Sequence, residues 1–104
     1  LNRHDITDCK ICKPCEAVKK PKTVFEKMDV KQGKLVMGFS SEMYGNDDST
    51  MPLLVMGDIF GGGPYSRLFT NVREKMSLCY YCVSVPEAIK GIMLVRAGIE
   101  NKNF

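Results

Sequence analysis

The sequence has 104 residues, a length that allows one domain with a modest hydrophobic core. Hydrophobic residues make up 44% and charged residues 26%, a balance that excludes a disordered or fibrous chain. The formal net charge is only +3, and no dense basic face with interleaved aromatic residues is visible, so nucleic acid is not expected as a partner.

The sequence also bears on the compartment of the protein. No apolar run approaches the roughly 18 residues that a membrane-spanning helix needs, and the first 20 residues lack the pattern of a signal peptide. We therefore expect no membrane association. The odd number of cysteines, five, fits free thiols in a reducing compartment better than a disulfide framework. A cytoplasmic location is the resulting expectation.

Residues 1–30 are predicted to form a linker or N-terminal arm, because they are irregular, contain two prolines and gather lysines. Cys9, Cys12 and Cys15 lie in this segment, and thiolates at such spacing can bind one metal ion. A closed zinc site needs four ligands, and the nearest candidate for the fourth is His4, the only histidine of the chain. An accidental cluster of cysteines in a linker is therefore favoured over a metal site.

Residues 31–104 are predicted to form the folded domain, which begins with a strand and a helix. The apolar run KLVMGF after Gly33 predicts the strand. Cap and turn residues follow, and a helix is predicted from the Asp48–Thr50 region to Phe60, with Pro52 in its first turn. Because this helix is apolar nearly all round, we expect it to be buried.

A second helix and two strands complete the predicted domain. Apolar residues recur at helical spacing between Pro64 and Met76, so this helix is predicted to begin at Pro64. The stretches CYYCVSV and GIMLVRAGI predict two strands, joined by the short connection PEAIK. The predicted fold class is therefore α+β, with a mainly antiparallel sheet covered on one face by helices.

Two helices over three strands leave part of the sheet uncovered. We therefore expect an incomplete repeat from a longer protein, whose exposed apolar surface supports self-association through a sheet edge or a helix face. The residues expected in the core are Leu35, Met37, Leu54, Ile59, Leu68, Phe69, Val72, Ile92 and Leu94.

A glycine-rich loop, formed by Gly61, Gly62 and Gly63, lies between the two predicted helices. A phosphate-binding P-loop needs a lysine after the glycines, and GGGPYSR has none. The dinucleotide pattern G-x-G-x-x-G fails as well, because its last position is Ser66 and a helix precedes the loop. The residues alone favour glycines that end one helix and let the next begin close by.

The remaining candidate side chains lie near the end of the second helix. Cys79 and Cys82 form a C-x-x-C pair, but in an extended strand they would point to opposite faces, so core packing is expected. With one histidine in the chain, no Ser-His-Asp or Cys-His catalytic arrangement is expected. Composition and periodicity alone favour a solvent-exposed role for Arg73 and sheet packing for Tyr80.

The block GGGPYSRLFTNVREKMSLCYY resembles the pitrilysin/insulinase family of zinc peptidases, which includes the mitochondrial processing peptidase and bacterial homologues. The family pattern of glycines, then S-R-L-F, then V-R-E-K, then a small residue and a tyrosine is matched almost continuously over residues 61–80. The flanking stretches DVKQGKLVMGFSSE and KGIMLVRAGIE resemble adjoining strands of the same domain. The resemblance therefore covers most of the predicted domain.

The resemblance implies a place for the zinc ion of the family. Its members consist of repeated α+β domains around a chamber for unfolded peptides, and zinc lies in the first domain, on an inverted H-x-x-E-H helix and a later glutamate. This sequence has no such helix, since His4 is followed by DIT. The resemblance is thus to the C-terminal, non-catalytic repeat, which implies no zinc in this chain and zinc in the parent protein or its partner.

In active members of the family, an arginine and a tyrosine seven residues apart in this repeat hold the substrate and the oxyanion at the scissile carbonyl. Arg73 and Tyr80 have that spacing, so the resemblance implies a substrate-binding role for both. It also implies that the glycine-rich loop either allows close packing or lines the chamber. The implied partners are an unfolded peptide and another repeat of the family, in the same chain or in a partner subunit.

The stretches DVKQGKLVMGF and SLCYY are most similar to a bacterial subgroup in which one partner lacks the zinc motif and works beside a sister protein. The parent protein is therefore expected to be either a zinc-dependent metalloendopeptidase or its inactive homologue. The alternative to a peptide-binding repeat is a catalytically inactive scaffold or interaction module that pairs with a peptidase-family partner. In both cases this chain alone is expected to have no peptidase activity.

Overall fold

The computed structural model describes residues 17–41, 43, 48 and 50–103. Its elements follow in the predicted order of strand, two helices and two strands, which confirms the α+β fold class. They are the strand β1 (Gly33–Ser40), the helix α1 (Thr50–Gly61), the π-helix η1 (Phe69–Lys75), the strands β2 (Cys79–Glu87) and β3 (Ile92–Ile99), and the short 3₁₀ turn η2 (Asn101–Asn103).

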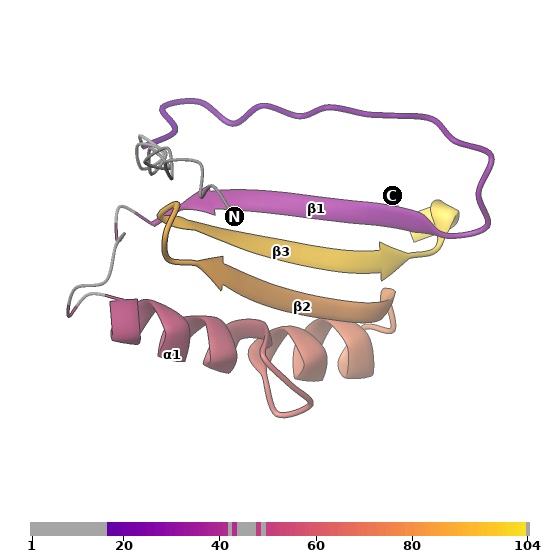
Figure 1. The fold of residues 1–104 in the computed structure, drawn as a ribbon. Coiled ribbons are helices and arrows are strands. Elements are labelled where there is room, and N and C mark those ends of the chain that lie inside the picture. The colour runs from indigo at the N-terminus through magenta and orange to yellow at the C-terminus, as the bar shows by residue number, and fades with distance from the viewer. Residues whose placement is uncertain (1–16, 42, 44–47, 49, 104) are drawn as a thin grey trace, which may run out of the picture.

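The three strands form one antiparallel sheet in the order β1-β3-β2, so β3 is the central strand (Figure 1). A tight turn joins β2 to β3, in which Lys90 N donates to Glu87 O at 3.0 Å. Gly91 completes this turn with a φ of 65°, a left-handed conformation that glycine adopts without steric cost. The predicted hairpin-like connection is thereby confirmed.

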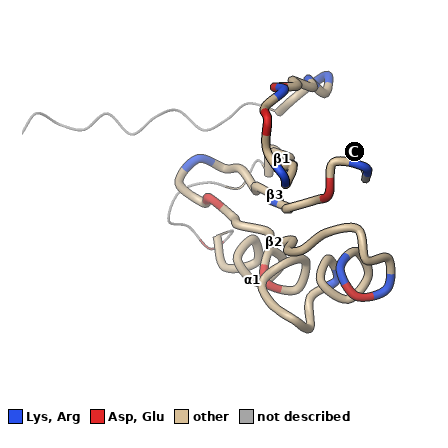
Figure 2. The backbone as a smooth tube through the Cα atoms, turned by 90° about the vertical axis from the view of Figure 1, so that its right-hand side faces the viewer, with Lys and Arg blue, Asp and Glu red and all other residues tan. Residues whose placement is uncertain are grey.

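The helices lie on the β2 side of the sheet, and β1 lies farthest from them (Figures 1 and 2). The buried residues of α1 are Leu53, Gly57 and Gly61, which recur every four residues and face β2. A side chain at Gly61 would overlap the main-chain nitrogen of Ser84, and Ser84 Oγ donates to Gly57 O at 2.5 Å. Glycine spacing therefore lets α1 approach β2 closely.

The core is built mainly from alternate side chains of β3, which point toward the helices and are buried. These residues are Met93, Val95, Ala97 and Ile99. None of the nine residues predicted for the core is among the buried ones, so that prediction is wrong in detail, although three of them pack partly buried against the core. These three are Leu35, Leu68 and Val72.

The prediction that α1 is buried is also wrong. One narrow stripe of this helix meets β2, and the rest of its apolar surface faces solvent. On β1, Met37 and Phe39 lie on the helix side of the sheet, opposite Val95 and Met93, but the helices do not cover them and both are exposed. The exposed apolar residues of α1 are Met51, Leu54, Val55, Met56 and Ile59.

The described part of the arm, residues 17–30, runs as an extended segment beside the outer edge of β1 (Figure 1). All of these residues are exposed. Within the described part of the chain, no helix has the length and hydropathy that crossing a membrane would require.

Candidate functional site

The site is built on the segment between the glycine-rich loop and β2. The predicted helix start at Pro64 is wrong by about one turn, because Pro64 lies in a turn closed by the bond from Ser66 N to Gly63 O at 3.0 Å. Ser66 is fully buried, and its hydroxyl oxygen accepts a hydrogen bond from Phe69 N at 3.3 Å. A serine at a helix N-terminus can satisfy a main-chain N–H in this way, so Ser66 fixes the start of the helix.

The helix widens at Phe69 into a π-helix of 7 residues. Its wider turns are marked by a hydrogen bond from Met76 N to Asn71 O, five residues back, at 3.1 Å. Such stretches are rare and are frequent at functional sites. At its end Ser77 adopts a left-handed φ of 52°, and the chain turns directly into β2. This geometry places the side chain of Arg73 against the start of β2.

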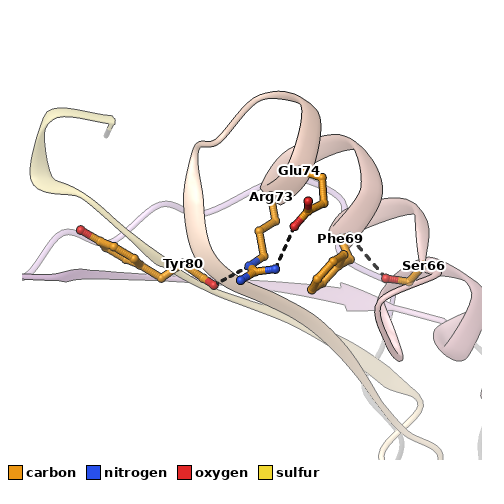
Figure 3. Close-up of polar contacts among 5 residues, drawn as sticks. All are labelled: Ser66, Phe69, Arg73, Glu74 and Tyr80. Carbon is orange, nitrogen blue, oxygen red and sulfur yellow. Dashed lines mark hydrogen bonds and ion pairs between the residues drawn. The ribbon is translucent and has the colours of Figure 1, made fainter.

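The guanidinium of Arg73 is held by three neighbours, which Figure 3 shows together. Its Nε donates to the main-chain oxygen of Tyr80 at 2.9 Å, and one terminal nitrogen donates to Glu74 Oε1 at 2.9 Å. The guanidinium carbon lies 4.6 Å from the centroid of the Phe69 ring, a cation–π distance. Arg73 is therefore oriented, although 40% of its side chain remains exposed.

Tyr80 contributes its main chain to Arg73 and its phenol to another partner. The phenol points away from the guanidinium (Figure 3) and donates to Glu100 Oε1 at 3.1 Å. This hydrogen bond to a carboxylate is the largest cause of the raised pKa of Tyr80. Glu100 forms an ion pair with Lys102, and the hydrogen bond from Lys102 is the largest cause of the lowered pKa of Glu100. The phenol is thus protonated and exposed at neutral pH.

Two shallow pockets meet at Arg73 and Tyr80, which line both. The first, of 310 Å³, also includes Glu74 and Glu100 and is mostly polar. The second, of 330 Å³, is mostly apolar and extends along β2 to the glycine-rich loop. Its lining residues are Gly61, Gly63, Pro64, Phe69, Arg73, Tyr80, Tyr81, Cys82 and Val83. The glycine-rich loop and the arginine–tyrosine pair therefore lie at one surface, with Gly61 and Gly63 on the second pocket.

The two cysteines of β2 lie on the same face of the sheet, and the prediction of opposite faces is wrong. A β-bulge between Cys79 and Tyr81 adds one residue, so Cys79 and Cys82 both point toward the helices, opposite Ile99 and Ala97. Burial, followed by the neighbouring Cys79, raises the pKa of the Cys82 thiol to about 11. Cys82 is therefore a protonated core side chain at the second pocket, whereas Cys79 is half-buried and lines the first pocket.

The predicted ligands of a metal site lie outside the described residues, since Cys9, Cys12, Cys15 and His4 all precede residue 17. Among the residues from 17 onward that the structure describes, no three His, Cys, Asp or Glu side chains are close enough together to hold a metal ion. Sequence reasoning missed Glu100 as a neighbour of Tyr80, because it is 20 positions away and only the pairing of β2 with β3 joins them.

Comparison with known proteins identifies the family. The sequence model of the "Peptidase M16 inactive domain" matches residues 4–104, almost the whole chain. The chain belongs to this family. The pitrilysin-family resemblance is confirmed, and the description of the domain as inactive agrees with a sequence that has no H-x-x-E-H helix.

Relatives of known sequence or structure are much longer than this chain. The "Probable inactive metalloprotease YmfF" of Bacillus subtilis is 48% identical over 84 residues, which are 81% of this chain and 20% of that protein. An "Uncharacterized zinc protease" of Rickettsia bellii is 39% identical over 56 residues, 54% of this chain and 14% of that protein. A crystal structure of a conserved protein from Enterococcus faecalis V583 matches with a TM-score of 0.67 and 42% identity, over 71% of this chain and 17% of that chain. The chain thus spans at most a fifth of these relatives.

Proposed function

We propose that this chain is the non-catalytic repeat of a longer protein of the zinc-metallopeptidase family and that Arg73 and Tyr80 bind an extended, unfolded peptide. The observation that supports this proposal most directly is that both residues line two adjoining pockets, one of which reaches the glycine-rich loop. An open surface with an apolar part and a few oriented donors suits a peptide main chain better than a compact small molecule.

The chemistry of the pair fits carbonyl binding. Arg73 is oriented by Phe69 and by the Tyr80 main chain, and its guanidinium carries five N–H donors, more than its present partners use. Tyr80 carries a protonated phenol at the same surface. Oriented donors stabilise a developing oxyanion most strongly when water is excluded. In this proposal, a zinc-bearing repeat closes over the surface and excludes the water.

That zinc-bearing repeat is the proposed partner, either in the same chain or in a partner subunit. The proposal is supported by the greater length of the relatives, of which this chain spans at most a fifth. It is also supported by the exposed apolar surface of α1, because large exposed apolar patches mark interaction surfaces.

The test uses the intact protein that contains this chain, together with its zinc-bearing partner. We expect the double substitution Arg73→Ala and Tyr80→Phe to reduce peptide turnover by about 100-fold, as the loss of an oxyanion donor does in other enzymes. The matched control is Arg67→Ala, which removes an exposed arginine from the same helical segment and is expected to change turnover little. Unchanged peptide affinity and turnover in the double variant would refute the peptide-binding role.

A second measurement concerns this chain alone. The purified chain is expected to leave an unfolded peptide uncut when zinc is added, because the sequence lacks the H-x-x-E-H helix. Robust cleavage that a chelator abolishes would contradict the assignment to a non-catalytic repeat.

One observation favours the alternative, an inactive scaffold or interaction module. The guanidinium of Arg73 binds the Tyr80 main chain and Glu74, and the Tyr80 phenol binds Glu100, so both polar groups already have partners within the chain. In the scaffold these bonds stabilise the junction of η1 with β2 and β3. The double variant would then lose stability and partner affinity with no specific loss of peptide affinity.

A further inference from the structure

Cys79 and Cys82 lie side by side on the helix side of the sheet. In an unbroken strand the two side chains of a C-x-x-C pair would point to opposite faces, and no bond could join the thiols. The bulge in β2 changes this, because the partners of the two cysteines on β3, Ile99 and Ala97, are both buried on the same side of that strand. The fold therefore brings together two thiols that a regular strand would keep apart.

The separation of the two main-chain positions suits a disulfide. Their partners on β3 are two positions apart, and a strand rises about 3.3 Å per residue, so the two Cα atoms are roughly 6.6 Å apart. The Cα atoms of a disulfide are usually about 4.4–6.8 Å apart. Cys82 is part of a buried cluster, and Cys79 packs against the same cluster. Little movement of the main chain is therefore needed to join the thiols.

The titration of Cys82 agrees with this proximity. Burial is the largest cause of its raised pKa, and the next two causes are a hydrogen bond with Cys79 and the charge of Cys79. Neighbouring charges shift a pKa mainly when they lie within about 4–6 Å. The two thiols are therefore close neighbours.

The two thiols differ in their access to small molecules. Cys79 is half-buried and lines the first pocket, whose volume is 310 Å³. Cys82 is only 5% exposed. A small molecule that enters the first pocket therefore meets Cys79 first, with Cys82 held beside it in the core.

We propose that Cys79 and Cys82 form a redox-active pair that a low-molecular-weight disulfide oxidises to an internal disulfide. The thiolate of Cys79 attacks one sulfur of the small disulfide, which breaks that S–S bond, forms a mixed disulfide and releases one small thiolate. This small thiolate takes up the proton that Cys79 lost.

The second step closes the ring. Cys82 attacks the Cys79 sulfur of the mixed disulfide, the internal S–S bond forms, and the second small thiol leaves with the proton of Cys82. Two protein thiols are thereby oxidised, and the small disulfide is reduced to two small thiols. Because the fold holds Cys82 beside the sulfur that it attacks, this step is intramolecular and is favoured over attack by a free thiol.

The experiment incubates the reduced whole chain with hydroxyethyl disulfide, a small uncharged oxidant, in the absence of oxygen. The reaction is stopped with acid, free thiols are alkylated in urea, and the chain is cut with trypsin. Cleavage after Lys75 and Lys90 gives one peptide, residues 76–90, that contains both cysteines and none of the other three. We expect mass spectrometry to find the internal disulfide in this peptide at a yield at least about threefold higher for the folded chain than for the chain oxidised in urea.

Two matched variants test the order of the steps, since each removes one thiol and keeps a small apolar side chain. Cys82→Ala should stop at the mixed disulfide, with one small thiol bound to Cys79. Cys79→Ala leaves only the buried thiol and should be modified at least about tenfold more slowly.

Three results would overturn the proposal. Free thiols at both positions of the oxidised wild-type peptide would mean that the pair serves core packing alone. A yield of internal disulfide no higher than in urea would mean that the fold does not hold the thiols together, and this comparison needs no variant. Equal modification rates of the two variants would exclude Cys79 as the thiol that reacts first.

Discussion

At the scale of single residues, the clearest consequence of the fold is the difference between the two thiols of β2. Cys82 is buried and its pKa is about 11, against an ordinary value of 9.0, whereas Cys79 is only half-buried. The thiolate is the reactive form, so at pH 8 a shift of this size lowers its population about 100-fold. We therefore predict that iodoacetamide alkylates Cys79 well before Cys82, as followed by peptide mass spectrometry.

The pH dependence gives this prediction its control. The alkylation rate of Cys82 should continue to rise up to about pH 11, and in urea it should level off near the ordinary pKa of a thiol. Because the unfolded state loses this proton first, the free energy of unfolding should fall as the pH rises above 9.0 toward 11. Equal reactivity of the two thiols in the folded chain would contradict the burial of Cys82.

Ser77 is the second residue whose conformation has a measurable effect. Its φ of 52° is in the left-handed region, which costs a residue with a side chain about 1 kcal/mol relative to glycine. We predict that Ser77→Gly raises the free energy of unfolding by roughly 0.5–1 kcal/mol in urea titrations, since the strain is removed and part of the gain is lost to chain entropy. Ser77→Ala keeps the strain and should give no such gain.

The site residues show how far sequence reasoning reaches at this scale. Only the family resemblance singled out Arg73 and Tyr80 as candidate site residues. On their own, solvent exposure explains the arginine and sheet packing explains the tyrosine. The contact of Arg73 with the Tyr80 main chain depends on the wide turns of η1 and on the bulge in β2. Neither feature has a marked signature in the sequence. The prediction that Cys79 and Cys82 point to opposite faces was wrong for the same reason, because it assumed a strand without a bulge.

At the scale of elements, the close approach of α1 to β2 depends on Gly57 and Gly61. A methyl group at Gly61 would overlap the main chain of Ser84, so the helix would have to move away. We predict that Gly61→Ala lowers the free energy of unfolding by about 1–3 kcal/mol, the usual cost of overpacking. The higher helix propensity of alanine, worth up to about 1 kcal/mol, offsets only part of this cost.

Gly38→Ala is the matched control, because a methyl group there meets only Leu94 at an ordinary van der Waals distance of 3.7 Å. This variant should have wild-type stability or slightly more, since alanine loses less chain entropy than glycine. If urea titration gave Gly61→Ala the same stability as Gly38→Ala, the contact between α1 and β2 would be looser than the structure has it.

The order of the elements was predictable because helical and strand periods differ, and turn residues separate the segments. Which side of α1 is buried was not predictable from hydrophobicity, since apolar residues surround this helix. The buried stripe contains Gly57 and Gly61 because these small residues let the helix approach β2 closely, and Leu53 lies on the same side. The predicted core residues Leu54 and Ile59 lie outside that stripe and are exposed.

At the scale of the whole molecule, the helix α1 differs from the rest of the surface in carrying almost no charge. The charged residues gather on the arm, on η1 and near the strand ends, whereas α1 carries a single charge, Asp58 (Figure 2). Exposed apolar residues cover the rest of α1 and the helix side of β1 at Met37 and Phe39. Large exposed apolar surfaces mark sites of protein–protein interaction, which is the property expected of a repeat that packs against another repeat.

This surface predicts self-association of the isolated chain through α1. The substitution of both Val55 and Ile59 by lysine places two charges on the exposed side of the helix, where burial against a second copy would cost each charge its hydration. We expect light scattering to show oligomers of the wild-type chain at high concentration and a monomer of the double variant. Ile89→Lys is the matched control, because Ile89 is 70% exposed in the turn between β2 and β3 and is not part of α1, and its variant should still associate. A wild-type chain that stays monomeric at high concentration would show that the apolar surface of α1 is insufficient for self-association, and the pairing surface would then require a repeat of different sequence.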